Sequence, residues 1–181
     1  MNYLIWNIMD ANTRLKIDPT MIFYHGTHAF FERFEDSFRG SNTAWDNTVH
    51  GFFFADKKEN ALLFGDTIIT ANLEVKNPLD LRLHSIFNDE SQASIIWNML
   101  TCEKIDNNTA LKLIKDEISL GKIHDMYGSL HSIGEHEMML EAGYDGIISD
   151  LGDEQIEYVV FQAMQITLLS IDRETFRGYT R

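Results

Sequence analysis

The side chains best suited to chemistry in this sequence are a glutamate and a histidine, each at one end of an apolar run. Glu157 opens the run EYVVF, and His25 closes the run MIFYH, with Gly26 directly behind it. A carboxylate can act as a general base, an imidazole can exchange protons near neutral pH, and glycine lets a ligand approach the backbone closely. Taken alone, a glutamate at a strand end is usually solvated and a lone histidine is usually a core side chain. A site therefore requires that the fold bring these groups together.

Short runs rich in β-branched and aromatic residues predict the strands that carry these groups. The runs are 21–24, 51–55, 67–75, 143–149, 155–161 and 165–169. The pair Asn77-Pro78 is predicted to break the third run. Asp56 and Glu59 have the spacing of a helix-capping box, and Gly65 is placed to end the short helix that this box would open. The phenylalanines of segment 30–38 recur at helix-like spacing and are interpreted as ordinary core.

Apolar residues at helical spacing predict a helical block between about 84 and 142. The sequence shows neither an internal repeat nor a linker, so we predict a single domain over 1–181. Within it, 1–20 would be an N-terminal extension and 84–142 a helical insertion. The alternation of strand-like and helical segments predicts the α+β fold class.

Composition argues against several classes of protein. The 181 residues carry 15 basic and 28 acidic side chains, and the resulting charge of -13 opposes loose binding to nucleic acid or anionic membranes. No apolar run approaches the roughly 18 residues of a spanning helix, and the N-terminus lacks the basic leader of a secretory signal. The single Cys102 fits a reducing compartment, so we expect a cytoplasmic protein without a membrane partner. His131 and His136 lack HExxH spacing, and no metal is expected.

Three segments, taken in order, match the pattern of a known family. They are YHGT at 24–27, then GFFFAD at 51–56 with Ala61 and Phe64, then EYVVF at 157–161 with Gln165-Ile166. Together they resemble the ADP-ribosyltransferases of the poly(ADP-ribose) polymerase-like group, which are diphtheria-toxin-like enzymes of the His-Tyr-Glu type. The match is closest to small bacterial and phage-associated members, which share NPLDL-like and GYDGI-like segments, here 77–81 and 143–147. The extension and the helical block lie outside the resemblance.

The resemblance implies a split β-sheet core that uses NAD as co-substrate without a metal. Carried over by position, the residues that bind NAD would be His25, Gly26, Thr27, Phe53, Asn60 and Phe64. His25 would hydrogen-bond the adenosine ribose with Thr27 nearby, and the Gly26 backbone would hold the nicotinamide carboxamide. The rings of Phe53 and Phe64 would sandwich the nicotinamide.

The catalytic residues implied by the resemblance are Glu157 and His25. Glu157 would contact the 2′-hydroxyl of the nicotinamide ribose. This hydrogen bond would strengthen as the transition state becomes oxocarbenium-like and gains positive charge.

Two positions depart from the family pattern. Phe53 stands where the family usually has tyrosine, so the stacking face is kept and the phenolic hydroxyl is lost. Asn60 stands where many relatives have serine, and its carboxamide can hydrogen-bond an amide. The alternative interpretation of Phe53 and Phe64 is simple core packing.

The function implied is a mono-ADP-ribosyltransferase that cleaves the nicotinamide glycosidic bond and transfers ADP-ribose to a macromolecular acceptor. The acceptor would be a protein or a nucleic-acid base, and the negative charge favours a protein. The context implied is a bacterial toxin, an effector or a phage-conflict protein, with an antitoxin as a candidate neutralising partner. Two alternatives stay open, an NAD glycohydrolase and a non-catalytic module that binds NAD or ADP-ribose. Phe53 is the main argument for the module, and retention of His25 and Glu157 argues against it.

Overall fold

The computed structural model describes residues 17–29, 31–41, 49–130, 132–150, 152 and 155–173, which form an α+β fold. Their strands make a seven-stranded mixed sheet in the order β4-β5-β6-β2-β1-β3-β7. The strands are β1 (Phe23–Thr27), β2 (Phe52–Ala55), β3 (Thr67–Leu73), β4 (Pro78–Asp80), β5 (Gly146–Asp150), β6 (Ile156–Val160) and β7 (Ile166–Arg173). The predicted fold class is confirmed. The run 67–75 ends before Asn77-Pro78, as predicted, and Pro78 itself begins the short strand β4, which pairs in parallel with β5.

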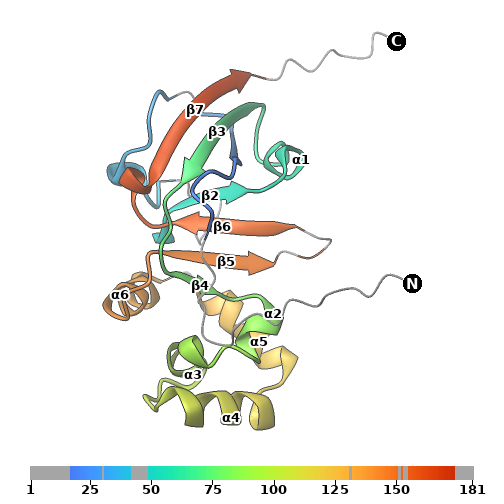
Figure 1. Ribbon diagram of the computed structural model, residues 1–181, viewed down its shortest axis with the longest axis vertical. Coiled ribbons are helices and arrows are strands. Elements are labelled where there is room, and N and C mark those ends of the chain that lie inside the picture. Colours follow the sequence, from blue (N-terminus) through green and yellow to red (C-terminus); the bar gives the residue numbers. More distant parts are fainter. Residues whose placement is uncertain are drawn as a thin grey trace, which may run out of the picture.

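The sheet is nearly divided between β1 and β2. β1 pairs with β3 at five positions but with β2 at one, where Tyr24 lies opposite Ala55. Figure 1 shows the consequence, because β3 and β7 run in a clearly different direction from β5 and β6. Backbone groups of β1 that follow Tyr24 and face β2 are therefore outside a continuous ladder.

A hydrophobic core covers each face of the sheet, because successive strand residues point to opposite faces. On one face, Ile147 of β5 and Val159 of β6 pack with side chains from the helical block. On the other face, Phe54 of β2 and Val160 of β6 pack with Phe23 of β1. Consecutive residues of β2 or β6 thus lie on opposite faces of the sheet, one facing the helical block and the other facing the second core. The face of each candidate site residue follows from its position along its strand.

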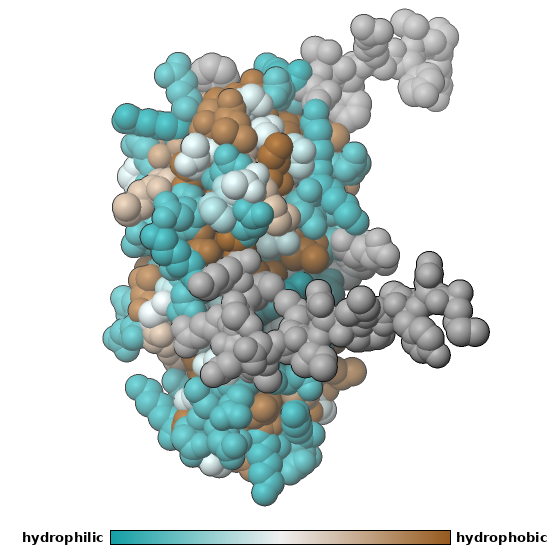
Figure 2. All heavy atoms as spheres, in the orientation of Figure 1, coloured by the Kyte–Doolittle hydropathy of each residue, from teal (hydrophilic) through white to brown (hydrophobic). Residues whose placement is uncertain are grey.

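The predicted helical block is confirmed between β4 and β5. It contains α2 (Leu83–Ile86), α3 (Ala93–Thr101), α4 (Asn107–Glu117), α5 (Leu120–Ser129) and α6 (Ile133–Glu141), together with a short 3-10 turn, η3 (Glu90–Gln92). Side chains of Asp106, Ser119 and Ser132 cap α4, α5 and α6 by accepting backbone N–H groups, as is typical of N-caps. Hydrophilic side chains predominate over this block in Figure 2. Among the helices of the described ranges, none combines the length and apolar character needed to cross a membrane.

The aromatic segment does not form the helix that its spacing indicates. Residues 31–41 contain only the 3-10 turn η1 (Asp36–Phe38). Phe34 packs against the second core, as expected, whereas Phe38 is 60% exposed and is not a core residue. The rings of Phe31 and Phe34 instead lie beside His25, at centroid distances of 6.2 and 5.3 Å. Phe30, the loop at 42–48 and most of the extension, 1–16, lie outside the described residues.

The short helix α1 (Lys58–Ala61) is also built differently from the prediction. Lys57 is its N-cap, in extended conformation and without a side-chain capping bond, so the capping box predicted from Asp56 and Glu59 is wrong. Gly65 lies beyond the helix and its C-cap residue, Leu62. A Cβ atom at Gly65 would lie 2.1 Å from the carbonyl carbon of Thr27. The glycine is therefore required by a close backbone contact with β1 rather than by the end of the helix.

Candidate active site

Glu157 lies in the first half of β6, between two neighbouring strands. Its cross-strand partners are Ala55 of β2 and Ser149 of β5, so the three side chains stand in one row on the same face. Tyr24 of β1 continues the row as the partner of Ala55. The methyl side chain of Ala55 is the smallest in the row and is buried. The glutamate is half-buried rather than solvated.

The environment of Glu157 favours the protonated carboxyl group. Burial raises its pKa to about 7, and the hydroxyl of Ser149 opposes this rise by donating to Oε1 at 3.2 Å. A carboxyl group that titrates near neutral pH can accept a proton or a strengthening hydrogen bond from a bound hydroxyl. Perturbed carboxyl groups of this kind are concentrated at functional sites.

His25 follows Tyr24 on β1, at the point where the pairing of β1 with β2 ends. Its Nδ1 lies 2.7 Å from the carbonyl oxygen of Phe53. A carbonyl only accepts, so Nδ1 is the donor and Nε2 of the neutral ring is an acceptor. Burial lowers the pKa of His25, and the hydrogen bond to the Phe53 carbonyl opposes this effect. Because the net shift is downward, the ring is mainly neutral at pH 7. An uncharged ring held in this way can accept a hydrogen bond from a ligand hydroxyl.

His25 and Glu157 are therefore not neighbours on one face of the sheet. Alternation along β1 puts Gly26 on the face of Tyr24 and Glu157, whereas the ring of His25 lies 5.6 Å from that of Phe54 in the opposite core. β2 connects the two groups, because His25 bonds its backbone at Phe53 and Glu157 pairs with the residue two positions later. A ligand that contacts both must lie across the split between β1 and β2.

The helix α1 is fixed directly on β1 beside this split. A Cβ atom at Gly26 would lie 1.7 Å from the carbonyl oxygen of Ala61, so only glycine permits the contact. The contact places Asn60 and Phe64 next to the end of β1. Nδ2 of Asn60 is buried and has no hydrogen-bond partner among the described residues, while the ring of Phe64 remains 43% exposed. An amide donor without a partner among the described residues, beside the point where the β1–β2 ladder ends, fits a ligand that carries a carboxamide.

One of the comparisons with known proteins identifies the family. The model of a family described as ADP-ribosyltransferase in polyvalent proteins matches residues 19–176, which is most of the chain. The chain belongs to this ADP-ribosyltransferase family. Domains of this kind use NAD as their substrate. A solved structure described as the crystal structure of an anti-CRISPR protein aligns at a TM-score of 0.41 and 18% identity, over 82% of this chain and 95% of that one. No curated protein matches the sequence.

Two of the predicted contacts in this ADP-ribosyltransferase domain stay predictions. Phe53 is half-buried and packs against the core on the helical side, which is the sheet face that also carries Glu157. The hydroxyl of Thr27 accepts the backbone N–H of Ala29 at 3.0 Å, which ties it to its own turn. The sandwich of Phe53 with Phe64 and the approach of Thr27 to a ribose remain expectations.

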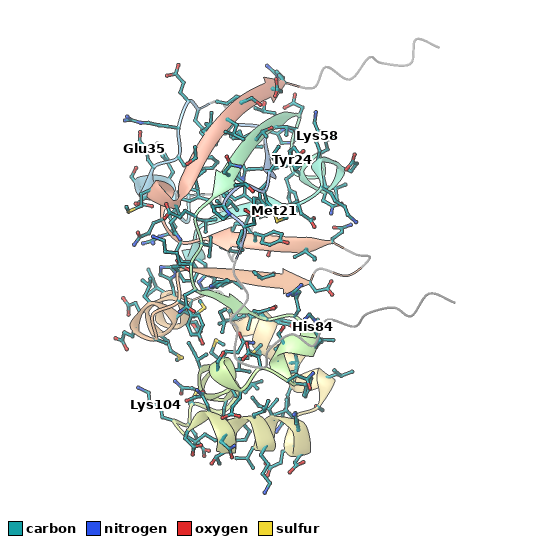
Figure 3. All side chains as sticks on the ribbon, viewed as in Figure 1. Met21, Tyr24, Glu35, Lys58, His84 and Lys104 are labelled. Atoms are coloured by element: carbon teal, nitrogen blue, oxygen red, sulfur yellow. The ribbon has the colours of Figure 1, made fainter. Side chains whose placement is uncertain are left out.

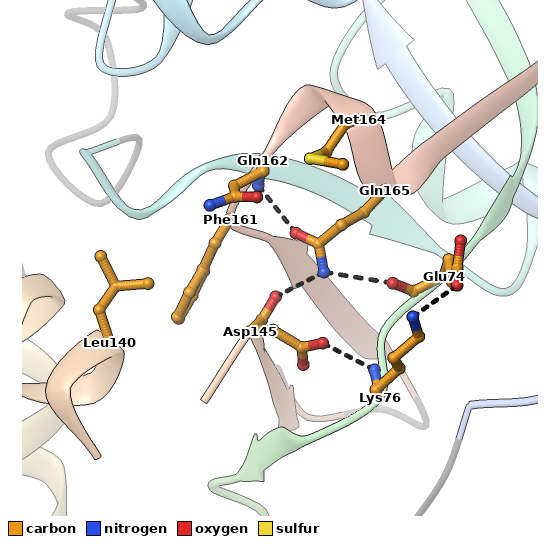
Figure 4. Close-up of a pocket in the computed structure, with 8 residues that line it drawn as sticks. All are labelled: Glu74, Lys76, Leu140, Asp145, Phe161, Gln162, Met164 and Gln165. Atoms are coloured by element: carbon orange, nitrogen blue, oxygen red, sulfur yellow. Dashed lines mark hydrogen bonds and ion pairs between the residues drawn. The ribbon is translucent and has the colours of Figure 1, made fainter. Parts of the chain in front are cut away.

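The motif residue Gln165, by contrast, has a structural role. Its Oε1 accepts the backbone N–H of Gln162 at 2.9 Å, and its Nε2 donates to the carbonyl groups of Glu74 and Asp145 at 3.2 and 3.0 Å (Figure 4). The carboxylate of Asp145 in turn accepts the N–H groups of Lys76 and Asn77, each at 2.8 Å. The NPLDL-like and GYDGI-like segments and the glutamine that follows β6 thus hold the strands in register.

Two cavities of the described residues lie away from the split. One of about 210 Å³ lies beside Gln165, and one of about 440 Å³ lies between α3, α4 and α6. Neither is lined by Glu157 or His25. Their polar groups are largely bonded to one another, whereas the split in the sheet carries the perturbed carboxyl group and the unused donor, so we assign the site to the split. No group of three metal-binding side chains occurs in the ranges that the structure describes.

Ser149 is the site residue that sequence reasoning missed. It is the fourth residue of β5, two positions after the GYDGI-like segment, and no spacing in the sequence connects it with Glu157. The strand pairing alone brings the two residues opposite each other. The only available signal is a polar residue that follows the buried residues of this strand.

Proposed function

We propose that the protein is an NAD-dependent mono-ADP-ribosyltransferase of the poly(ADP-ribose) polymerase-like, His-Tyr-Glu type. The observation that carries the proposal is Glu157, a half-buried carboxyl group whose pKa is raised to about 7 and which stands beside the split in the sheet. Membership of the ADP-ribosyltransferase family supplies the reaction class.

Different residues around the split bind different parts of NAD in this proposal. Nδ2 of Asn60, which has no partner among the described residues, suits the carboxamide of nicotinamide, and the partly exposed side chain of Phe64 is the candidate to contact its ring. Nε2 of His25 accepts a ribose hydroxyl, because Nδ1 is committed to the Phe53 carbonyl. That carbonyl belongs to the backbone, so phenylalanine in place of the usual tyrosine does not disturb the orientation of the histidine.

The reaction breaks the bond between the anomeric carbon of ribose and the nicotinamide nitrogen, and nicotinamide leaves with the bonding electrons. Glu157 accepts a hydrogen bond from the ribose 2′-hydroxyl, which stabilises the positive charge that develops on the sugar. The nucleophile of the acceptor then forms the new bond to the anomeric carbon. Its proton goes to the carboxylate or to solvent.

The acceptor proposed is a macromolecule, and the charge of -13 supports a basic protein surface over nucleic acid. The biological setting proposed is a cytoplasmic toxin, effector or phage-conflict protein, for which an antitoxin is a neutralising partner. Both proposals rest on the sequence resemblance and the charge.

The test measures release of nicotinamide from NAD, with and without cell lysate. A label in the adenosine moiety of NAD follows the ADP-ribose in the same reactions. Glu157→Ala is expected to abolish release in a folded protein, and Glu117→Ala, which removes an exposed glutamate at the end of α4, serves as the control. Label retained on a macromolecule identifies a transferase, and protease or nuclease sensitivity identifies the acceptor. Release only as free ADP-ribose would identify a glycohydrolase instead. Saturable NAD binding without release would refute catalysis.

A further inference from the structure

The carboxyl group of Glu157 has one hydrogen-bond donor among the described residues, the hydroxyl of Ser149. The distance from Ser149 Oγ to Glu157 Oε1 is 3.2 Å. The two residues are direct cross-strand partners in a continuous five-residue ladder between β5 and β6, flanked by the buried pair Ile147 and Val159. Their separation is therefore set by the sheet and not by a movable loop.

We propose that Ser149 is a positioning residue for the ADP-ribosyltransferase reaction, and the inference rests on the function proposed above. Its hydroxyl holds Oε1 of Glu157, which fixes the plane of the carboxylate and leaves Oε2 directed to the ribose 2′-hydroxyl. A hydrogen bond to the charged form of a carboxyl group also favours ionisation. Ser149 thus acts on the reaction through Glu157 without contacting NAD.

The other titratable groups near Glu157 do not replace this hydroxyl. Asp150 follows Ser149 on β5, so alternation directs its side chain to the opposite face of the sheet. Asp56 lies beyond the end of β2, and after burial its charge is the next cause that raises the pKa of Tyr158, which lies on that opposite face. Tyr24 of β1 shares the face but is separated from Glu157 by Ala55. Burial pushes the pKa of Glu157 up, and Ser149 is the one group that pulls it down.

The decisive experiment titrates Glu157 itself and follows the activity of the same proteins. The carboxyl resonance is observed by carbon NMR in protein labelled at glutamate and is assigned with Glu157→Gln. Ser149→Ala is compared with Ser149→Thr, which keeps the hydroxyl on a residue suited to strands. The control is Ser170→Ala, because Ser170 is a half-buried serine of β7 that donates to Asp172 at 2.7 Å, on a different strand pair.

In Ser149→Ala the pKa of Glu157 is expected to rise. Nicotinamide release should fall about tenfold at slightly acid pH, the effect of one hydrogen bond to a charged group, and recover toward the wild-type rate at alkaline pH. KM for NAD should change little, and Ser149→Thr and Ser170→Ala should keep the wild-type pH profile.

An unchanged pKa of Glu157 in folded Ser149→Ala would overturn the inference, whatever the activity. A raised pKa with an unshifted pH profile would overturn it as well, because the hydroxyl would then have no effect on the reaction. If the pKa of Glu157 rises in Ser149→Ala but the wild type releases no nicotinamide, the hydrogen bond is supported and the proposed function is refuted.

Discussion

Replacing Glu157 by glutamine should make the protein more stable above neutral pH. The unfolded carboxyl group ionises with a pKa of 4.5, whereas burial raises the pKa of the folded group to about 7. Between these values the folded state holds a proton that the unfolded state has lost, so the stability of the wild type falls as pH rises through the window. Glutamine keeps the shape and an oxygen that can accept from Ser149, but it does not ionise.

The magnitude follows from the same two pKa values. Their separation corresponds to about 3 kcal/mol of stability lost by the wild type above the window. Because the side chain is only half-buried and solvent screens part of the effect, we expect about 2 kcal/mol. For a domain of this size that is a rise in Tm of roughly 4–8 °C in Glu157→Gln.

Urea denaturation followed by circular dichroism at several pH values between about 4 and 8 measures this difference. The stability gain should be small at about pH 4, where the folded and the unfolded wild type both hold the proton, should grow through the window, and should be full above about pH 7. Glu117→Gln, at an exposed position of α4, should show no such pH-dependent gain. A Glu157→Gln protein that is less stable than wild type at alkaline pH would refute the environment assigned to this carboxyl group. Confirmation would show that the candidate catalytic residue is kept at the expense of stability.

Three further outcomes follow from single contacts. Gly26→Ala should lower stability by about 2 kcal/mol or more and weaken NAD binding in calorimetry, because its Cβ would overlap the Ala61 carbonyl oxygen. Gln165→Ala should cost about 2–3 kcal/mol in urea denaturation through the loss of three hydrogen bonds, with nicotinamide release retained below the transition. Burial and then Arg39 lower the pKa of His136 to about 4, so the unfolded state takes up a proton before the folded state as pH falls. In urea denaturation the free energy of unfolding of the wild type should therefore fall by about 2 kcal/mol from roughly pH 7 to pH 5, and that of His136→Gln should fall less.

The parts of the fold that sequence could predict are those whose pattern is local. Runs such as 67–75 and 155–161 are rich in β-branched and aromatic residues, and they form β3 and β6. The helical block follows from apolar spacing, and its side chains form the core on one face of the sheet. β7 was expected from a shorter run and extends to Arg173.

The failures have a common physical cause, which is that long-range contacts override local patterns. The phenylalanines of 31–38 have helical spacing, yet Phe31 and Phe34 pack around His25, a partner from β1 that the local sequence does not reveal. Asp56 and Glu59 have capping-box spacing, yet the close contact of Gly26 with Ala61 fixes where α1 lies, and the helix begins after Lys57. Sequence spacing describes neighbours along the chain, and these sites are decided by neighbours across the sheet.

The split in the sheet shows most directly how the site depends on such contacts. If β1 and β2 continued their ladder past Tyr24, the carbonyl of Phe53 would bond to the backbone of β1. Instead it accepts from the imidazole of His25, which fixes the tautomer and turns the second ring nitrogen into an acceptor. The same interruption leaves the β2-facing backbone after Tyr24 without strand partners, beside the row that contains Glu157. A residue that restored the pairing would therefore remove both the unpaired edge of β1 and the carbonyl acceptor that orients His25, and the proposed NAD site depends on both.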